Sequence, residues 1–201
     1  YNISELKDEI HPILEKIIES NEPQRFEILI KFSNFKIKNY IDYIFPYSVN
    51  YPKVLKWLYF NKYYNNQIIE NAFYEACLSN NIEQVKWLKS LGTFINYHKN
   101  NDELFRLSCN KQCYDSVILL CKFTNFRLKI ESYFNDQYID EVPFHFFCRH
   151  NYLELAKLYV KEFDFDISTL NHEAISLSCQ EGHLEMAKFC YQLGGDLTIN
   201  N

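Results

Sequence analysis

The chain has 201 residues, of which 47% are hydrophobic and 17% aromatic, and its formal net charge is −5 at pH 7. The negative charge and the absence of a Lys/Arg cluster argue against a nucleic-acid-binding protein, because phosphate contact needs a basic surface. No apolar run approaches the ~20 residues of a membrane helix and no signal peptide opens the chain, so we expect a soluble protein without membrane insertion, cytoplasmic or, as an open alternative, nuclear.

One short pattern recurs along the chain at intervals near thirty residues. It is clearest at 75–88 (EACLSNNIEQVKWL), 147–160 (FCRHNYLELAKLYV) and 178–191 (SCQEGHLEMAKFCY). We align six copies on one position, the anchor column, which holds Ile18, Tyr47, Cys77, Cys109, Cys148 and Cys179. Successive anchors are 29, 30, 32, 39 and 31 residues apart. Self-similarity at such a period predicts a repeat array whose neighbouring units share one continuous core.

Each copy is expected to contain two helices joined by a turn. Apolar residues at helical spacing predict an amphipathic second helix that begins five residues after the anchor; the positions are Pro23, Pro52, Ile82, Tyr114, Leu153 and Leu184. In the last copy we expect the buried stripe to run from Leu184 to Ala187, Phe189 and Leu193. The turn position, three residues after the anchor, requires a residue that tolerates positive φ; we assign it to Asn21, Asn50, Asn80, Asn151 and Gly182. Gly92 and Gly194 should end second helices in the left-handed conformation.

The first two copies are the least regular. Apolar residues from Ile3 to Ile18 fit either the first helix of a repeat or a cap that only shields the array, and both interpretations stay open. In copy two, Pro46 lies inside the expected first helix and should cut or kink it.

Copies three and four carry the pattern moderately well, and an insertion follows them. The 39-residue interval exceeds its neighbours by about eight residues, which places extra sequence at about 126–142 and should lengthen the projecting loop. Tyr133, Phe134, Tyr138 and Ile139 give this loop side chains of the kind that dominate protein interfaces. Packing of these side chains back onto adjacent helices is the alternative.

Copies five and six carry a family resemblance. Residues 179–195 read CQEGHLEMAKFCYQLGG and resemble the second half of an ankyrin repeat; Val142 to His145 (VPFH) is similar to the TPLH opening of that repeat. The other copies depart from this opening with NAFY, ELFR and EAIS. The resemblance implies an all-α solenoid of paired antiparallel helices with projecting loops and little or no strand. It would form a single domain over 1–201 with approximate repeats at 3–35, 36–65, 66–97, 98–130, 137–167 and 168–199.

The resemblance also implies a function, that of a non-catalytic module that binds a protein partner through its concave face and loops. Carried over by alignment, the partner-binding residues at the ends of first helices are Leu78, Ser79, Asn110, Lys111, Arg149, His150, Gln180 and Glu181. The loop candidates are Gln67, Ile68, Glu70, Lys99, Asn100, Asp102, Tyr138, Ile139 and Glu141. For any one of these residues a solvated spacer is the alternative.

The seven cysteines fit packing better than chemistry. Small buried thiols let neighbouring helices approach closely, and four of them share the anchor column. Cys109 with Cys113, and Cys148 with His145 and His150, are the only clusters with metal-like spacing, and neither has a second pair at finger spacing. We therefore expect no metal, no cofactor, no disulfide and no catalytic residue. His183 is interpreted as a turn residue that caps the last helix.

A second hypothesis is that the array recruits substrates for, or is a structural segment of, a larger enzyme, ligase adaptor or effector. The chain starts at Tyr1 and stops at DLTINN, where a further loop should begin, so we expect it to belong to a longer protein.

Overall fold

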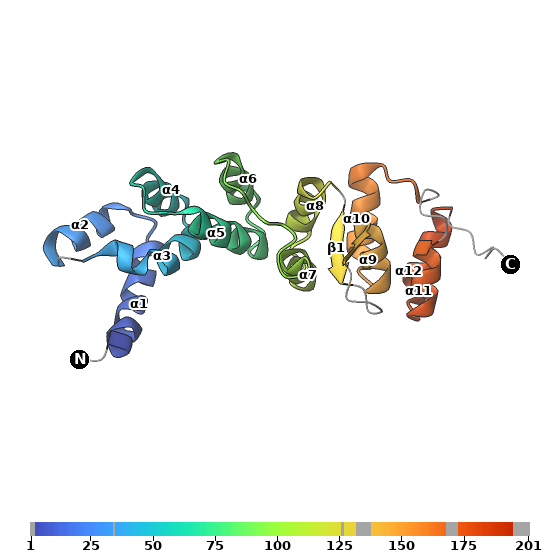
Figure 1. Cartoon of the computed structure of the whole chain (residues 1–201), viewed down its shortest axis with the longest axis horizontal. Coiled ribbons are helices and arrows are strands. Elements are labelled where there is room, and N and C mark those ends of the chain that lie inside the picture. Colours follow the sequence, from blue (N-terminus) through green and yellow to red (C-terminus); the bar gives the residue numbers. More distant parts are fainter. Residues whose placement is uncertain (1–2, 34, 126, 132–137, 168–172, 195–201) are drawn as a thin grey trace. The chain divides into compact units, whose positions relative to one another are not determined.

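The computed structural model describes residues 3–33, 35–125, 127–131, 138–167 and 173–194, and this part of the chain is helical apart from one short hairpin (Figure 1). The predicted all-α class is therefore confirmed. None of the described helices is long and apolar enough to cross a lipid bilayer. The chain divides into two compact units, unit 1 (Tyr1–Asn96) and unit 2 (Tyr97–Asn201).

Unit 1 contains three helix pairs. Its elements are α1 (Ile3–Glu19), α2 (Gln24–Ser33), the 3-10 helix η1 (Ile37–Tyr40), α3 (Ile41–Tyr47), the 3-10 helix η2 (Ser48–Asn50), α4 (Pro52–Phe60), α5 (Asn66–Leu78) and α6 (Ile82–Ser90). The first helices of the three pairs are neighbours, since α3 packs against both α1 and α5.

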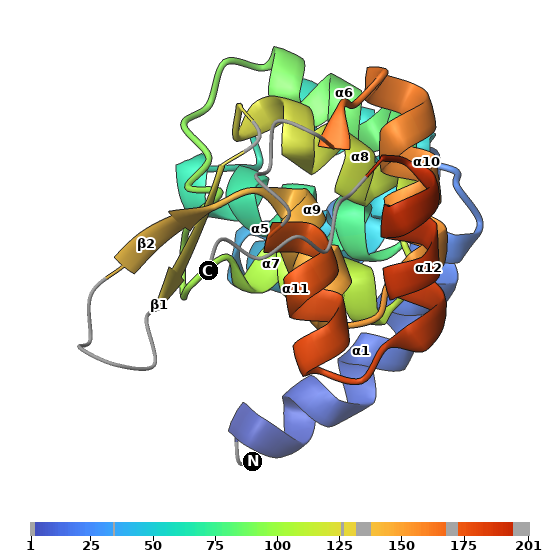
Figure 2. The same ribbon diagram turned by 90° about the vertical axis from the view of Figure 1, so that its right-hand side faces the viewer.

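Unit 2 contains three further pairs and the hairpin. Its elements are α7 (Glu103–Asn110), α8 (Tyr114–Phe123), β1 (Leu128–Glu131), β2 (Tyr138–Glu141), α9 (Pro143–Arg149), α10 (Leu153–Phe163), α11 (Glu173–Gln180) and α12 (Leu184–Gln192). The first helices α9 and α11 pack together, and each packs against the second helix of its own pair, α10 or α12 (Figure 2).

The second helices begin where the sequence predicts. Pro52 is the first residue of α4, and Ile82, Tyr114, Leu153 and Leu184 open α6, α8, α10 and α12. Proline is tolerated there because the first helical residues have no intrahelical partner for their N–H groups. Helix α2 begins at Gln24, directly after the predicted proline.

The turn position adopts positive φ in five of the six pairs. Asn21, Asn80, Asn151 and Gly182 have φ of 51°, 54°, 58° and 74°, as predicted, and Gln112 joins them at 58°. Gly92 and Gly194 follow their helices at 74° and 98°, also as predicted.

Asn50 is the exception, and the assignment of a positive φ to it was wrong. Pro46 ends α3 at Tyr47, and the chain continues as η2, whose last residue is Asn50. Because that turn already reverses the chain through Ser48–Asn50, no left-handed residue is needed. The expected irregularity of copy two is confirmed.

The anchor column is buried in four of six pairs. Ile18, Cys77, Cys109 and Cys148 are 0% exposed, whereas Tyr47 is half-buried. Burial of Cys179 was predicted and is wrong, because Cys179 is exposed. Cys148 shows the reason: its Sγ lies 3.7 Å from Sγ of Cys190 on α12 in the following pair, and among the described residues no pair follows α12.

The last helix also buries different residues from those predicted. Leu184 is 64% exposed, and Met186 and Cys190 fill the core instead. The predicted stripe of Leu184, Ala187, Phe189 and Leu193 is therefore wrong, because Leu184 is exposed and the other three are only half-buried.

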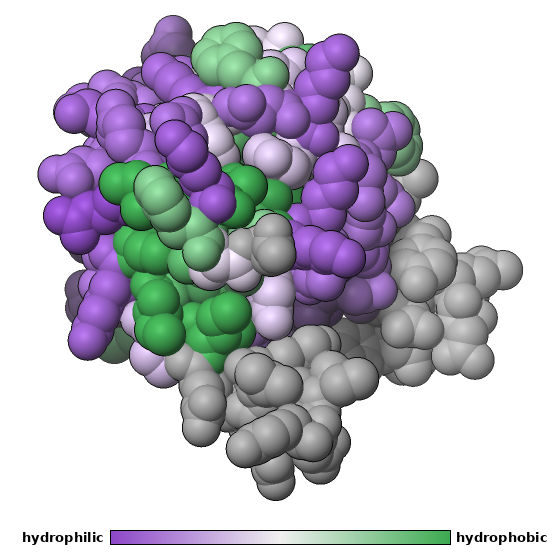
Figure 3. All heavy atoms as spheres, turned by 90° about the vertical axis from the view of Figure 1, so that its left-hand side faces the viewer, coloured by the Kyte–Doolittle hydropathy of each residue, from purple (hydrophilic) through white to green (hydrophobic). Residues whose placement is uncertain are grey.

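The first pair leaves apolar surface at its end of unit 1. Leu14 and Ile18 of α1 are fully buried, but Ile13 and Ile28 are 53% and 57% exposed. Figure 3 shows apolar side chains gathered on this face. A terminal cap is expected to present a polar outer face, and these isoleucines do not fit that expectation.

The insertion forms the hairpin. β1 and β2 are antiparallel, with Leu128 opposite Glu141 and Ile130 opposite Ile139. The backbone there is paired rather than irregular. Tyr133 and Phe134 lie outside the described residues.

Candidate functional site

The predicted site residues lie at the carboxyl ends of first helices. In unit 1, Leu78 is the last residue of α5 and half-buried, whereas Ser79 follows it and is exposed. The Ser79 hydroxyl donates to the backbone carbonyl of Glu75 at 2.7 Å. The side chain therefore completes the helix end and leaves the surface beside it open.

In unit 2, the same positions follow one another on three helices. Asn110, Arg149 and Gln180 are the last residues of α7, α9 and α11. Arg149 is half-buried, and the exposed members are Asn110, Lys111, His150, Gln180 and Glu181. Their placement follows the prediction, and their role in binding stays a prediction.

Neighbouring helix pairs are joined by hydrogen bonds from one recurring position. We name this position, four residues after the anchor, the bridging column. Asn81 Nδ2 donates to the Val49 carbonyl at 3.2 Å, and His183 Nε2 contacts the Arg149 carbonyl at 3.0 Å. In each case a turn residue satisfies a backbone acceptor near the end of the preceding first helix.

Tyr152 is the third member of the bridging column. Its hydroxyl donates to Oδ1 of Asn110 in the preceding pair. Partial burial, followed by the field of nearby Cys109, raises the pKa of Tyr152. Asn110, predicted to face a partner, thus has its carbonyl oxygen engaged within the protein.

The predicted capping role of His183 is wrong. His183 precedes α12 at the N-cap position, but its side chain makes no cap hydrogen bond. The ring reaches the Arg149 carbonyl instead, because an orphan carbonyl at the end of a helix needs a donor.

Charged groups from three helix pairs surround His150. Its ring lies against Phe146, with centroids 4.3 Å apart. Partial desolvation beside Phe146, followed by the charge of Arg149, lowers the pKa of His150; His183 and Arg106 act in the same direction, and Glu181 opposes them. The structure therefore brings Arg149, His150 and Glu181 into one electrostatic neighbourhood on unit 2.

Tyr138 and Ile139 lie in β2, opposite Glu131 and Ile130. The hairpin positions their backbones by pairing with β1.

The predicted loop role of Gln67, Ile68 and Glu70 is wrong, because all three lie within α5. Asn65 caps that helix by accepting a hydrogen bond from the Ile68 amide at 2.8 Å. Ile68 is 2% exposed, and it serves the core.

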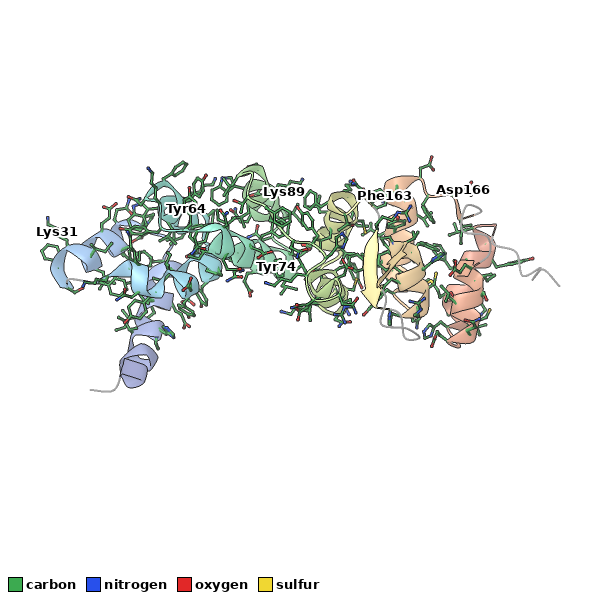
Figure 4. The ribbon with its side chains drawn as sticks, viewed as in Figure 1. Lys31, Tyr64, Tyr74, Lys89, Phe163 and Asp166 are labelled. Carbon is green, nitrogen blue, oxygen red and sulfur yellow. The ribbon has the colours of Figure 1, made fainter. Side chains whose placement is uncertain are left out.

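Glu70 holds the segment after α6 onto α5. Its carboxylate accepts a hydrogen bond from the Asn96 amide at 3.1 Å. Tyr74, which projects from α5 in Figure 4, donates through its hydroxyl to the Asn96 carbonyl at 2.8 Å. Both side chains therefore hold Asn96, the last residue of unit 1, against α5.

In unit 2, the loop candidate Asp102 is also placed differently from the prediction. It is 1% exposed, has a left-handed φ of 55° and lies 2.8 Å from Nδ1 of His98. Asn100 remains exposed and donates to Glu103 at 2.7 Å.

Two of the buried thiols, those of Cys109 and Cys121, are poor nucleophiles. Burial raises the pKa of Cys109 well above its usual value, and burial also raises that of Cys121. A buried neutral thiol is unreactive, because the thiolate is the attacking species. In the described ranges, no three His, Cys, Asp or Glu side chains gather as a metal site would require.

The sequence did not reveal the bridging column. Its members Asn81, Tyr152 and His183 differ in chemical type, and each reaches a different acceptor. Only their common distance from the anchor connects them.

Comparison with protein-family models, curated proteins and solved structures gives no match.

Proposed function

We propose that the chain is a non-catalytic protein-binding repeat module of ankyrin type, which binds a protein partner through residues at the ends of its first helices. Sequence periodicity, helix pairing and exposed polar residues at corresponding positions support the proposal.

Side-chain contacts at about one repeat of separation support the repeat character. Trp57 Nε1 donates to the Glu27 carboxylate at 3.0 Å, a separation of 30 residues. Asn21 Oδ1 accepts from the Lys53 amide at 3.0 Å, 32 residues further along. His183 and Arg149 are 34 residues apart. Contacts of this kind are expected when each pair packs mainly on its sequence neighbours.

The main support for this proposal is that polar residues of different type recur beside the buried anchor column. Cys109 and Cys148 are 0% exposed, yet Lys111 and His150, two residues after them, are exposed and chemically unlike one another. The core fixes their spacing while their identity is free to match a partner. Exposed side chains held by a rigid scaffold are a common basis of recognition.

A charge-swapped pair of variants tests the proposal. Lys111→Glu with Glu181→Lys changes two exposed site positions without changing net charge. The matched control, Lys161→Glu with Glu162→Lys, makes the same exchange at two exposed residues of α10. Partners captured from an extract of the source cells would be identified by mass spectrometry.

We expect the site variant to lose a partner that the wild type and the control both retain, with helical circular dichroism unchanged. Equal capture by all three proteins would contradict the proposed surface.

A further inference from the structure

A hollow of about 260 Å³ opens between the second and third helix pairs of unit 1. Tyr47 and Tyr51 line one side of it, and Glu75 and Ser79 line the other. The two sides are neighbours, since α3 and η2 both pack against α5 (Figure 1). Pro46 also lines the hollow and ends α3 one residue later, so the irregular turn of copy two forms one of its walls.

Three tyrosine rings form a row that leads into the hollow. The centroids of Tyr43 and Tyr47 are 5.5 Å apart with planes inclined by 27°, and those of Tyr47 and Tyr51 are 6.3 Å apart with planes inclined by 15°. The hydroxyl of Tyr47 donates to Glu19 at 3.1 Å, and that of Tyr43 donates to Glu15. These hydrogen bonds fix the hydroxyl groups of Tyr43 and Tyr47 beside carboxylates.

The Tyr47 phenol stays neutral at physiological pH. Burial, followed by the hydrogen bond to Glu19, raises the pKa of Tyr47 to about 12. A neutral phenol ring has a negative face that attracts cations. The row is therefore a surface for a positive group and adds no charge of its own.

Glu75 supplies the full negative charge. Its side chain is exposed, and within the part of the chain that the structure describes no cation pairs with its carboxylate. The Ser79 hydroxyl donates to the Glu75 backbone carbonyl and not to the carboxylate. The carboxylate oxygens remain free to accept hydrogen bonds from a ligand.

Aromatic faces beside a free carboxylate fit a planar cation best. A guanidinium group stacks on a tyrosine ring and donates two parallel hydrogen bonds to one carboxylate. An ammonium group can use the carboxylate and the ring face but cannot form that fork, and a neutral urea group lacks the charge. Arginine is the protein side chain that can both stack on the tyrosine rings and pair with the Glu75 carboxylate.

We propose that this hollow binds an arginine side chain of the protein partner, stacked on Tyr47 and Tyr51 and paired with Glu75. The inference rests on the proposed function, since it names the group that the partner presents to unit 1.

The probe is N-acetyl-arginine amide, titrated into the ¹⁵N-labelled full chain and followed by amide chemical shifts. We expect shifts concentrated at residues 46–51 and 75–79. N-acetyl-lysine amide should bind more weakly, and N-acetyl-citrulline amide, which has the shape of arginine without its charge, should give no saturable shifts. Equal responses to arginine and citrulline, or shifts absent from both segments, would overturn the proposal.

Two variants and one control locate the contact. Glu75→Gln and Tyr51→Leu should each weaken arginine binding about threefold to fivefold, the range for an exposed ion pair or a ring contact. Glu83→Gln, which removes an exposed carboxylate from the first turn of α6, should leave binding unchanged. Equal weakening by Glu83→Gln would show a diffuse charge effect and overturn the site.

This titration and the capture experiment on Lys111 and Glu181 fail independently. If the protein does not bind the arginine probe but partner capture still depends on Lys111 and Glu181, only the proposed arginine site is contradicted. If the Lys111→Glu and Glu181→Lys exchange does not change partner capture while arginine still binds beside Glu75, the proposed binding surface of unit 2 is contradicted.

Discussion

Nε2 of His183 lies 3.0 Å from the backbone carbonyl oxygen of Arg149, and this contact joins the turn of the last helix pair to the end of α9. A carbonyl cannot donate, so the Nε2 atom carries the proton. Asn81 and Tyr152, at the aligned positions, also donate hydrogen bonds to the preceding helix pair. The pairs are therefore held together by their turns as well as by their core.

We expect His183→Ala to lower the free energy of unfolding by about 1 kcal/mol, the typical net value of one intramolecular hydrogen bond. Urea unfolding of the full chain measures it. Gln180→Ala is the control, because Gln180 is exposed and three residues away. His183→Asn should recover part of the loss, since Asn81 makes the equivalent contact. Equal effects of His183→Ala and Gln180→Ala would contradict the bridging role.

Glycine should act in opposite directions at two aligned turn positions. Gln112 has a φ of 58°, which costs a residue with a side chain about 1–2 kcal/mol. Gln112→Gly should therefore stabilise the protein by about 0.5 kcal/mol after the entropy of glycine is subtracted.

Asn50 ends a 3-10 helix and accepts a hydrogen bond from Asn81 Nδ2 at 3.2 Å. Asn50→Gly should destabilise by about 1 kcal/mol, because it removes that bond and adds backbone entropy to the unfolded chain. Thermal unfolding compares the two variants. A stabilising Asn50→Gly would contradict the structure of copy two.

Thiol reactivity separates Cys179 from the other six cysteines. Only Cys179 is exposed, and the rest are buried. Ellman's reagent should therefore modify about one thiol rapidly in the native protein and the remainder after denaturation. Cys179→Ser should remove the fast phase. Fast modification that persists in this variant would show that the buried anchor column is accessible.

Stability should decrease on mild acidification because of His145. Burial lowers its pKa, with Arg149 adding to the effect and Glu173, 3.9 Å from Nδ1, opposing it. The folded protein therefore binds fewer protons than the unfolded chain near the unfolded pKa of about 6.5. The contribution is complete above that pH and is lost as the pH falls from there through the lower pKa of the folded protein.

Urea unfolding at pH 7.5 and at pH 5.5 measures this dependence. The shift at His150 has the same sign, so replacing both histidines by asparagine should flatten the profile. A double variant with an unchanged slope would assign the dependence to other groups.

The sequence predicted the helix pairs because the local signals are strong. Proline at Pro52 and apolar residues at helical spacing locate the start of a second helix, and asparagine at Asn80 signals a left-handed turn. These signals depend on backbone physics that one residue decides.

The sequence could not predict features that depend on neighbouring pairs. Cys179 and Cys148 share a column, but one is exposed and the other buried, because coverage comes from the next pair. The hollow beside Glu75 depends on η2. The sequence did not predict η2, because its last residue, Asn50, was assigned to a left-handed turn. The α5 start was the one missed local signal, since Asn65 is a good N-cap residue.

Site-specific photo-crosslinking tests whether the ends of the first helices bind the partner. A photoreactive phenylalanine analogue replaces Lys111, His150 or, as the control on a second helix, Lys161 of α10, and the protein is irradiated in an extract of the source cells. We expect Lys111 and His150 to crosslink to the same protein partner and Lys161 not to crosslink to it. Crosslinks that form only from Lys161, or equally from all three positions, would contradict recognition through the ends of the first helices.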